Sequence, residues 1–161
     1  MISLEIVIDY WDNLNEKSHI DIYKLFSSET TIYVKYTRVE VDEDNTENEK
    51  TDCFNFSKLE TLKDFIHKRF KQIKRNDRYE LNEVLFELYK NENVLMSDRL
   101  DWEFTGFFRF KKMLDEYLNF VKYMNIEHNT KLLNNFLIKH TKNDITNNLP
   151  QEIIDIIMMN I

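Results

Sequence analysis

Apolar and polar residues alternate along the first ten positions of the chain. The apolar residues that share one parity are Ile2, Leu4, Ile6, Ile8 and Tyr10. A period of two that is rich in β-branched residues predicts a half-buried strand. Residues 30–41 alternate in the same way, with Ile32, Val34 and Tyr36 on one face. We expect these two strands to pair in one small antiparallel sheet.

Helical spacing follows in two places. Within residues 18–27, Ile20, Tyr23 and Phe26 lie three positions apart, which predicts a short helix. Residues 57–60, Ser-Lys-Leu-Glu, fit a capping box, in which the serine hydroxyl accepts from one free amide and the glutamate reaches back to another. The apolar stripe behind this box predicts a longer helix and consists of Leu59, Leu62, Ile66 and Ile73, flanked by Phe65 and Phe70.

A second cap pattern occurs at residues 77–80, Asp-Arg-Tyr-Glu. It precedes apolar residues at i, i+3, i+4 and i+7, which predict another helix that closes at residues 91–93. The apolar residues are Leu81, Val84, Leu85 and Leu88.

Residues 102–110 fit two structures. The residues that share the parity of a strand are Trp102, Phe104, Phe108 and Phe110, whereas Phe107 and Phe110 have helical spacing with Leu114. We favour a helix from about residue 105 to residue 123, since helix ends predicted from sequence are good only to ~2–4 residues. A further amphipathic helix is predicted over residues 130–142. The last begins at residue 148 or 149, with Pro150 in its first turn.

The pattern as a whole predicts an α+β fold, with a small N-terminal antiparallel sheet packed with a mostly helical C-terminal two-thirds. A chain of 161 residues suits a single globular domain. We divide this domain into a β-rich part over residues 1–42, an acidic loop over residues 43–56 and a helical part over residues 57–161.

Composition limits the cellular setting. No stretch reaches about 18 apolar residues, so no membrane span is expected. Glu5 and Asp9 interrupt the apolar start where a signal peptide needs an unbroken run, and Cys53 is the only cysteine, so we expect a cytoplasmic protein without disulfides. One glycine, no alanine, and many Asn, Ile, Lys and Asp residues are typical of AT-rich genomes, such as those of viruses, phages, mobile elements or low-GC bacteria.

Most motif-based chemistry is excluded. With Gly106 as the only glycine, the chain has no glycine-rich phosphate loop and no nucleophile elbow. It has neither an H-E-x-x-H motif nor a cysteine pair for zinc. The acidic run resembles a calcium loop, but Glu47 replaces the required glycine and Cys53 the bidentate glutamate. We therefore assign no catalytic residue, no metal ligand and no cofactor, and expect a protein that is not an enzyme.

Charge is unevenly distributed around a net charge of −7. Residues 40–52 hold seven acids and one lysine, and residues 63–78 hold seven bases and two acids. The acidic segment is a candidate site for a basic protein partner, or a solvated loop, and its candidate residues are Asp42, Glu43, Asp44, Glu47 and Glu49. The basic segment is a second-rank candidate for nucleic-acid binding through Lys68, Lys71, Lys74 and Arg75. It equally suits a solvated helix face or internal pairing with the acidic loop.

Not all of the aromatic residues in 102–110 can face inward from one helix or strand. The residues left over, with Trp102 and Phe108 as the candidates, are expected to form an exposed anchor for a partner or a contact between copies of the chain.

The C-terminal residues 149–157, L-P-Q-E-I-I-D-I-I, resemble the L-P-x-E-I-x-x-x-I opening of an F-box, as found truncated at the end of many poxvirus proteins. The resemblance implies that Leu149, Pro150, Ile153 and Ile157 contact the Skp adaptor of a cullin-type ubiquitin ligase. It covers thirteen residues, 149–161, and no ankyrin repeats precede it. The same residues also suit an apolar helix face that docks on this domain or on a partner.

These observations favour a small acidic protein-binding module, of viral, phage or mobile-element type, that inhibits or modulates a host or competitor macromolecule. The alternatives are an F-box-like adaptor and a nucleic-acid-binding protein that uses residues 63–78.

Overall fold

The computed structural model describes residues 2–27, 31–101, 106–127 and 138. The chain divides into two compact units, one of Met1–Ile126 and a second of Glu127–Ile161. Almost all described residues belong to the first unit. The helices predicted over residues 130–142 and from residue 148 or 149 onward lie outside the described residues, and the single domain stays a prediction.

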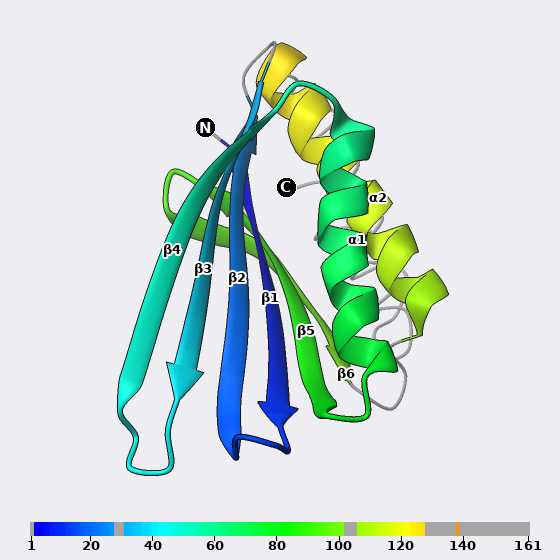
Figure 1. The fold of residues 1–161 in the computed structure, drawn as a ribbon. Coiled ribbons are helices and arrows are strands. Elements are labelled where there is room, and N and C mark those ends of the chain that lie inside the picture. The colour runs from blue at the N-terminus through cyan, green and yellow to red at the C-terminus, as the bar shows by residue number, and fades with distance from the viewer. Residues whose placement is uncertain (1, 28–30, 102–105, 128–137, 139–161) are drawn as a thin grey trace, which may run out of the picture. The chain divides into compact units, whose positions relative to one another are not determined.

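Six strands and two long helices make up the described part of the chain (Figure 1). In chain order they are β1 (Ile2–Asp12), β2 (Lys17–Ser27), β3 (Ile32–Val41), β4 (Glu47–Phe56), α1 (Leu59–Arg75), β5 (Tyr79–Lys90), β6 (Asn93–Asp101) and α2 (Phe107–Glu127).

The strands form one antiparallel sheet in the order β4-β3-β2-β1-β5-β6. The first four strands follow each other as hairpins. The chain then passes through α1 and returns as β5 on the other side of β1, so that the first strand lies inside the sheet. Both helices lie along the same face of the sheet (Figure 1). We call this the helical face and the opposite one the open face.

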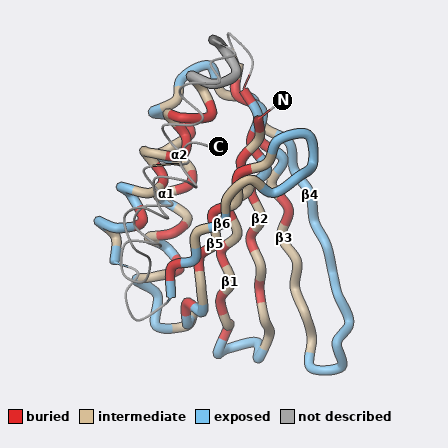
Figure 2. The backbone as a smooth tube through the Cα atoms, turned by 180° about the vertical axis from the view of Figure 1, so that it is seen from behind, coloured by how far each residue is buried: buried red, intermediate tan, exposed pale blue. Residues whose placement is uncertain are grey.

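The core lies between the helical face and the two helices. Along β1 and β2, buried residues alternate with partly exposed ones, because successive side chains point to opposite faces (Figure 2). The buried side chains come mainly from β1, β2, β5 and both helices, with a few from β3 and β6, and include Leu4, Ile6, Ile8, Leu25, Val34, Val84, Phe86, Leu100, Leu62, Ile66, Phe70, Phe110 and Tyr117.

Several predicted elements are confirmed. The strands at the N-terminus and at residues 32–41 exist, although β2 lies between them and pairs with both. The helix predicted behind residue 57 is α1, but its N-cap is Lys58 and no side chain caps it. The helix favoured over residues 105–123 is α2, at Phe107–Glu127, so the strand alternative is wrong for residues 107–110.

The prediction of a mostly helical C-terminal two-thirds is wrong, because residues 79–90 and 93–101 form the strands β5 and β6. A β-bulge explains why the apolar residues of β5 have the spacing expected of a helix. Tyr10 pairs with Leu81 while Asp9 pairs with Glu83, so one extra residue, Asn82, interrupts the alternation. Leu81 and Val84 are therefore both buried although they lie three positions apart.

The short helix predicted over residues 18–27 is wrong for a related reason. These residues form β2, in which Tyr23 faces the core while Ile20 and Phe26 lie on the open face. This strand has apolar residues on both faces. Apolar residues on opposite faces can therefore lie three positions apart, which is also the spacing of a helix.

The acidic loop predicted over residues 43–56 is also wrong for most of its length. Only the turn at residues 42–46 lies outside the strands, and Asn45 has a positive φ of 62° there. The rest is β4, an edge strand whose first seven residues are exposed. Because solvent reaches both faces of such a strand, its sequence needs no apolar alternation, and its charged residues discourage pairing with other chains.

Candidate functional site

The five acids of the predicted acidic site lie at the turn end of the β3–β4 hairpin. Asp42, Glu43 and Asp44 lie in the β3–β4 turn, and Glu47 and Glu49 on β4. The Asp42 carboxylate forms an ion pair of 2.7 Å with Lys17 in the neighbouring hairpin. Among the described residues, these five acids form no ion pair with α1, so the predicted internal pairing with the basic helix is not formed.

The four residues of the predicted nucleic-acid site all lie on α1, in different surroundings. Lys68 lines a cleft beside the sheet, whereas the Arg75 guanidinium lies 4.9 Å from the centre of the Phe107 ring on α2. Lys71 is half-buried near His67, whose pKa is lowered by burial and by this lysine.

Of the predicted partner contacts elsewhere, the structure describes only Phe108, which is 82% exposed on α2. Its neighbours Phe107 and Phe110 pack against Phe70 of α1. Trp102 and the four F-box-like residues, Leu149, Pro150, Ile153 and Ile157, lie outside the described residues. In the part of the chain that is described, neither helix has the length and apolar character needed to cross a bilayer.

The open face holds a group of apolar side chains that the sequence patterns did not reveal. Val7 on β1 lies between Ile22 of β2 and Leu85 of β5, and Ile20 pairs with Val39 of β3. Each of these side chains is partly exposed, and no described helix covers them. The apolar members of this face are Val7, Trp11, Ile20, Ile22, Phe26, Tyr33, Val39, Val41, Leu85, Tyr89 and Val94.

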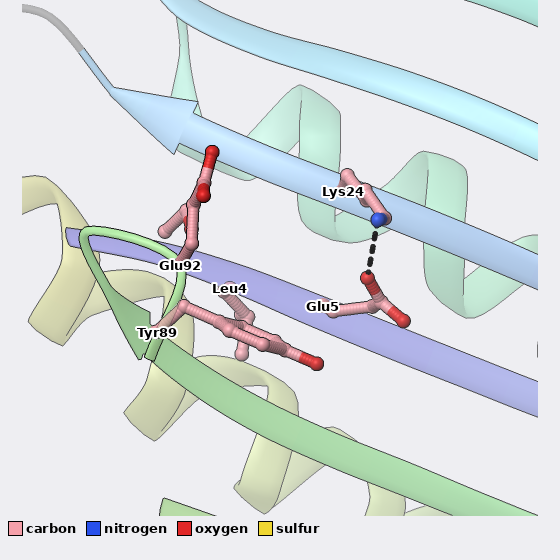
Figure 3. A pocket seen from close by; sticks show the side chains of 6 residues that line it. Leu4, Glu5, Lys24, Tyr89 and Glu92 are labelled. Carbon is pink, nitrogen blue, oxygen red and sulfur yellow. Dashed lines mark ion pairs between the residues drawn. The ribbon is translucent and has the colours of Figure 1, made fainter. Parts of the chain in front are cut away.

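Aromatic residues close one end of this face. The rings of Phe26 and Tyr33 stack with their centres 5.2 Å apart, and each side chain is 38% exposed. A depression of about 350 Å³ lies on the same face, lined by Tyr89, Lys24 and Glu5 among others (Figure 3). Two stacked, exposed rings on a face that also carries a depression are typical of a binding anchor.

Acids outnumber bases around the apolar residues. The strand register places eight acids on the open face, which are Glu5, Asp9, Glu47, Glu49, Glu80, Glu83, Glu87 and Asp101. The bases on the same face are Lys24, Lys35 and Arg99. Lys24 is paired with Glu5 at 3.1 Å (Figure 3), and Arg99 with Glu83 at 3.0 Å. The open face therefore combines an apolar centre with a negative surround.

A buried carboxylate organises the helical face near the middle of β2. Asp21 is fully buried and accepts hydrogen bonds from the Nε atoms of Arg38 and Arg69, each at 2.9 Å. The hydroxyls of Tyr36 and Tyr10 also donate to its Oδ1 atom, at 3.0 and 3.4 Å. We call these five residues the Asp21 network.

The tyrosines of this network stay protonated. Burial, and next to it the negative charge of Asp21, raises the pKa of Tyr10 to about 12. Burial likewise raises the pKa of Tyr36. Because both phenols keep their protons, they donate to Asp21 rather than repel it, which is the arrangement of a satisfied structural network.

The Asp21 network is assembled from residues far apart in the sequence, on β1, β2, β3 and α1. A signal was present, since Asp21 lies between Ile20 and Ile22 and shares its strand parity with Tyr23. A charged residue at an inward position of a strand predicts a buried ion pair. The helical spacing in residues 18–27 concealed that parity.

A second ion pair ties the end of β1 to the segment that follows α1. Arg78 donates from Nε and Nη2 to the two carboxylate oxygens of Asp12, at 2.7 and 2.6 Å. The amides of Leu14 and Asn15 also donate to this carboxylate. The Nε2 atom of His19 lies 3.5 Å from Asp12, within ion-pair distance, although neither nitrogen of that ring has a hydrogen bond.

Acid is expected to weaken the fold through Asp12. The hydrogen bonds from Arg78 hold the pKa of this carboxyl well below its ordinary value of 3.8. A carboxyl with a lowered folded-state pKa stabilises the fold above the unfolded-state pKa, and this stability is lost as the pH falls further. In denaturation curves, the Asp12→Asn variant should be less stable than the wild type at pH 7, and the gap should narrow below about pH 4.

The matched control for this experiment is Asp77→Asn, which changes an exposed acid next to Arg78. It should leave the stability nearly unchanged at every pH. A gap between wild type and Asp12→Asn that stays constant from about pH 7 to about pH 2 would contradict the role given to the Asp12 charge.

The described residues contain no cluster of three or more His, Cys, Asp or Glu side chains suited to a metal ion. Comparisons with protein families, with curated proteins and with solved structures find no match to this chain. The function is therefore argued from the surfaces of the sheet.

Proposed function

We propose that this protein is a protein-binding module that uses the open face of its sheet to bind a basic partner. The observation that carries the proposal is the apolar centre of this face within a surplus of acids. Apolar side chains supply affinity when they are covered, and the acids favour a partner whose surface carries Lys and Arg around an apolar patch.

The size of the open face suits a protein partner. Six strands about 4.8 Å apart, each about ten residues long, give a sheet of roughly 24 Å by 33 Å, or about 800 Å². A standard protein–protein interface buries about 800 Å² on each partner. The apolar centre is only part of this area, and exposed apolar patches with a polar rim are usually interaction sites.

In this proposal the protein inhibits or modulates its partner by occupying that partner's surface. The absence of recognisable catalytic motifs in the sequence supports this mode of action. The site differs from the one predicted from the sequence, because the acids act together with side chains from several strands rather than as a loop.

The test is capture of partners from the natural host by the wild type and by two lysine variants, with identification by mass spectrometry. Ile22→Lys places a charge in the centre of the open face, whereas Phe108→Lys makes an equally large change on α2. We expect one basic protein to bind the wild type and Phe108→Lys. Its affinity for Ile22→Lys should fall roughly 30-fold or more, the loss typical of a central interface residue.

Circular dichroism and thermal unfolding establish that both variants are folded. A partner that binds Ile22→Lys as tightly as the wild type would contradict the proposal. A partner lost only with Phe108→Lys would move the interface to α2, and recovery of the protein's own copies alone would show a homo-oligomer contact instead.

A further inference from the structure

The helical face contains a cleft that the proposed protein interface does not use. It lies between α1 and strands β2 to β4, has a volume of about 370 Å³, and is lined in part by the Asp21 network. Ligand sites in proteins usually measure about 300–1,000 Å³, so this cleft suits a molecule of one or two rings.

One wall of the cleft is aromatic. Tyr23 and Tyr36 have ring centres 5.0 Å apart, and Phe54 and Phe65 have ring centres 5.2 Å apart. The Phe65 ring also meets Tyr23 edge to face at 6.3 Å. Rings from β2, β3, β4 and α1 thus line one cleft, and such surfaces favour a flat aromatic ligand.

The other wall is cationic. Arg38, Arg69 and Lys68 line it, against Asp52 in the wall and the buried Asp21 beneath. Three cations face two acids, which leaves one positive charge without compensation. Arg38 contacts Asp21 through Nε only, and its two terminal nitrogens form no hydrogen bond with any described residue.

The buried carboxylate fixes this wall in advance. Asp21 holds Arg38 from β3 and Arg69 from α1 in one place, and Arg69 also donates from Nη2 to the Tyr10 hydroxyl at 2.6 Å. Side chains held before binding lose little freedom when a ligand arrives, which raises affinity.

We propose that this cleft binds a small planar aromatic anion. The ring would lie against Phe54 and Phe65, and a carboxylate or phosphate would contact the terminal nitrogens of Arg38 and the Lys68 ammonium. The aromatic wall selects for the ring, and the uncompensated positive charge selects for the anionic group.

The probes are 2-naphthoate, the neutral 2-naphthamide and 2-naphthyl phosphate, titrated into the full chain and followed by calorimetry and NMR. We expect 2-naphthoate to bind, with shifts at the Arg38 Nε–H and at the Phe54 and Phe65 rings. The amide should bind about tenfold more weakly, because it lacks the charge-assisted hydrogen bonds. The tighter of the two anions identifies the preferred group as a carboxylate or a phosphate.

A matched pair of variants isolates the cationic wall. Lys68→Gln removes a charge from the cleft and leaves the Asp21 network intact, whereas Lys71→Gln removes a charge from the same helix outside the cleft. Only Lys68→Gln should weaken the binding of 2-naphthoate, by about fivefold.

Three results would overturn the inference: no binding of either anion at millimolar concentration, equal binding of the amide, or equal effects of the two lysine variants. The inference is independent of the proposed interface. The Ile22→Lys variant should bind 2-naphthoate as the wild type does, so each proposal can fail without the other.

Discussion

Replacing Asp21 with asparagine is expected to lower the free energy of unfolding by about 3–5 kcal/mol, the usual cost of removing one partner from a buried ion pair. Asparagine has the same shape but no charge, so Arg38 and Arg69 lose their shared counter-ion. Both guanidiniums keep some access to water, with 32% and 22% of each side chain exposed. The loss should therefore lie toward the lower end of that range.

Urea denaturation at neutral pH measures this effect, with Asp64→Asn as the control. Asp64 is an exposed acid on α1, and its replacement should change the free energy of unfolding by less than about 0.5 kcal/mol. If Asp21→Asn proved as stable as the control, the Asp21 carboxylate would not be holding the two arginines.

A triple variant separates stability from the proposed ligand site. Buried ion pairs can often be replaced by apolar residues of similar size without loss of stability. We expect Asp21→Leu/Arg38→Met/Arg69→Met to be far more stable than Asp21→Asn, yet to have a much weaker preference for 2-naphthoate over 2-naphthamide, because only Lys68 is left to contact the anionic group. The network would then serve to position the cationic wall rather than to hold the fold together.

Replacing Phe70 with alanine is expected to cost about 3–5 kcal/mol, the typical loss for a buried phenylalanine. Phe70 has no exposed surface and stacks on Phe110 of α2 with ring centres 3.9 Å apart. It also meets Phe107 edge to face at 5.8 Å. The substitution therefore leaves a cavity between α1 and α2. Since domains of this size have a total stability of about 5–15 kcal/mol, much of it would be lost.

Phe108→Ala is the matched control, because it makes the same chemical change on α2 at a side chain that is 82% exposed. Its unfolding midpoint should stay within the error of the wild type, while that of Phe70→Ala shifts strongly. Equal losses for the two variants would show that Phe70 does not join the two helices.

The elements that could be predicted from the sequence are those that bury only one of their faces, because their apolar residues then recur with a single period. α1 shows a clear stripe because only one of its faces is buried, through Leu62, Ile66, Phe70 and Ile73. β1 alternates in a similar way, since three of the five residues on its open face are the polar Ser3, Glu5 and Asp9. In both cases the spacing of apolar residues in the sequence matches the spacing of buried residues in the structure.

The pattern failed where a strand has a bulge, two apolar faces or an edge position. The bulge lies in β5, the strand with two apolar faces is β2, and the edge strand is β4. The surfaces on which the proposals rest were missed for the same reason, because the open face and the Asp21 network exist only after several distant segments have paired. The spacing of residues within one segment does not predict which distant segments it will pair with.

The placement of β1 has a consequence for synthesis. Its Ile2 end pairs with Lys90, near the end of β5. A growing chain that has passed β4 can already form the β1–β4 hairpins, but one side of β1 then still presents unpaired backbone and the side chains of Ile6 and Ile8. Unpaired apolar edges of this kind recruit other chains. Nascent chains that stop before β5 emerges from the ribosome are thus the aggregation-prone species, and β5 is the segment that ends this exposure.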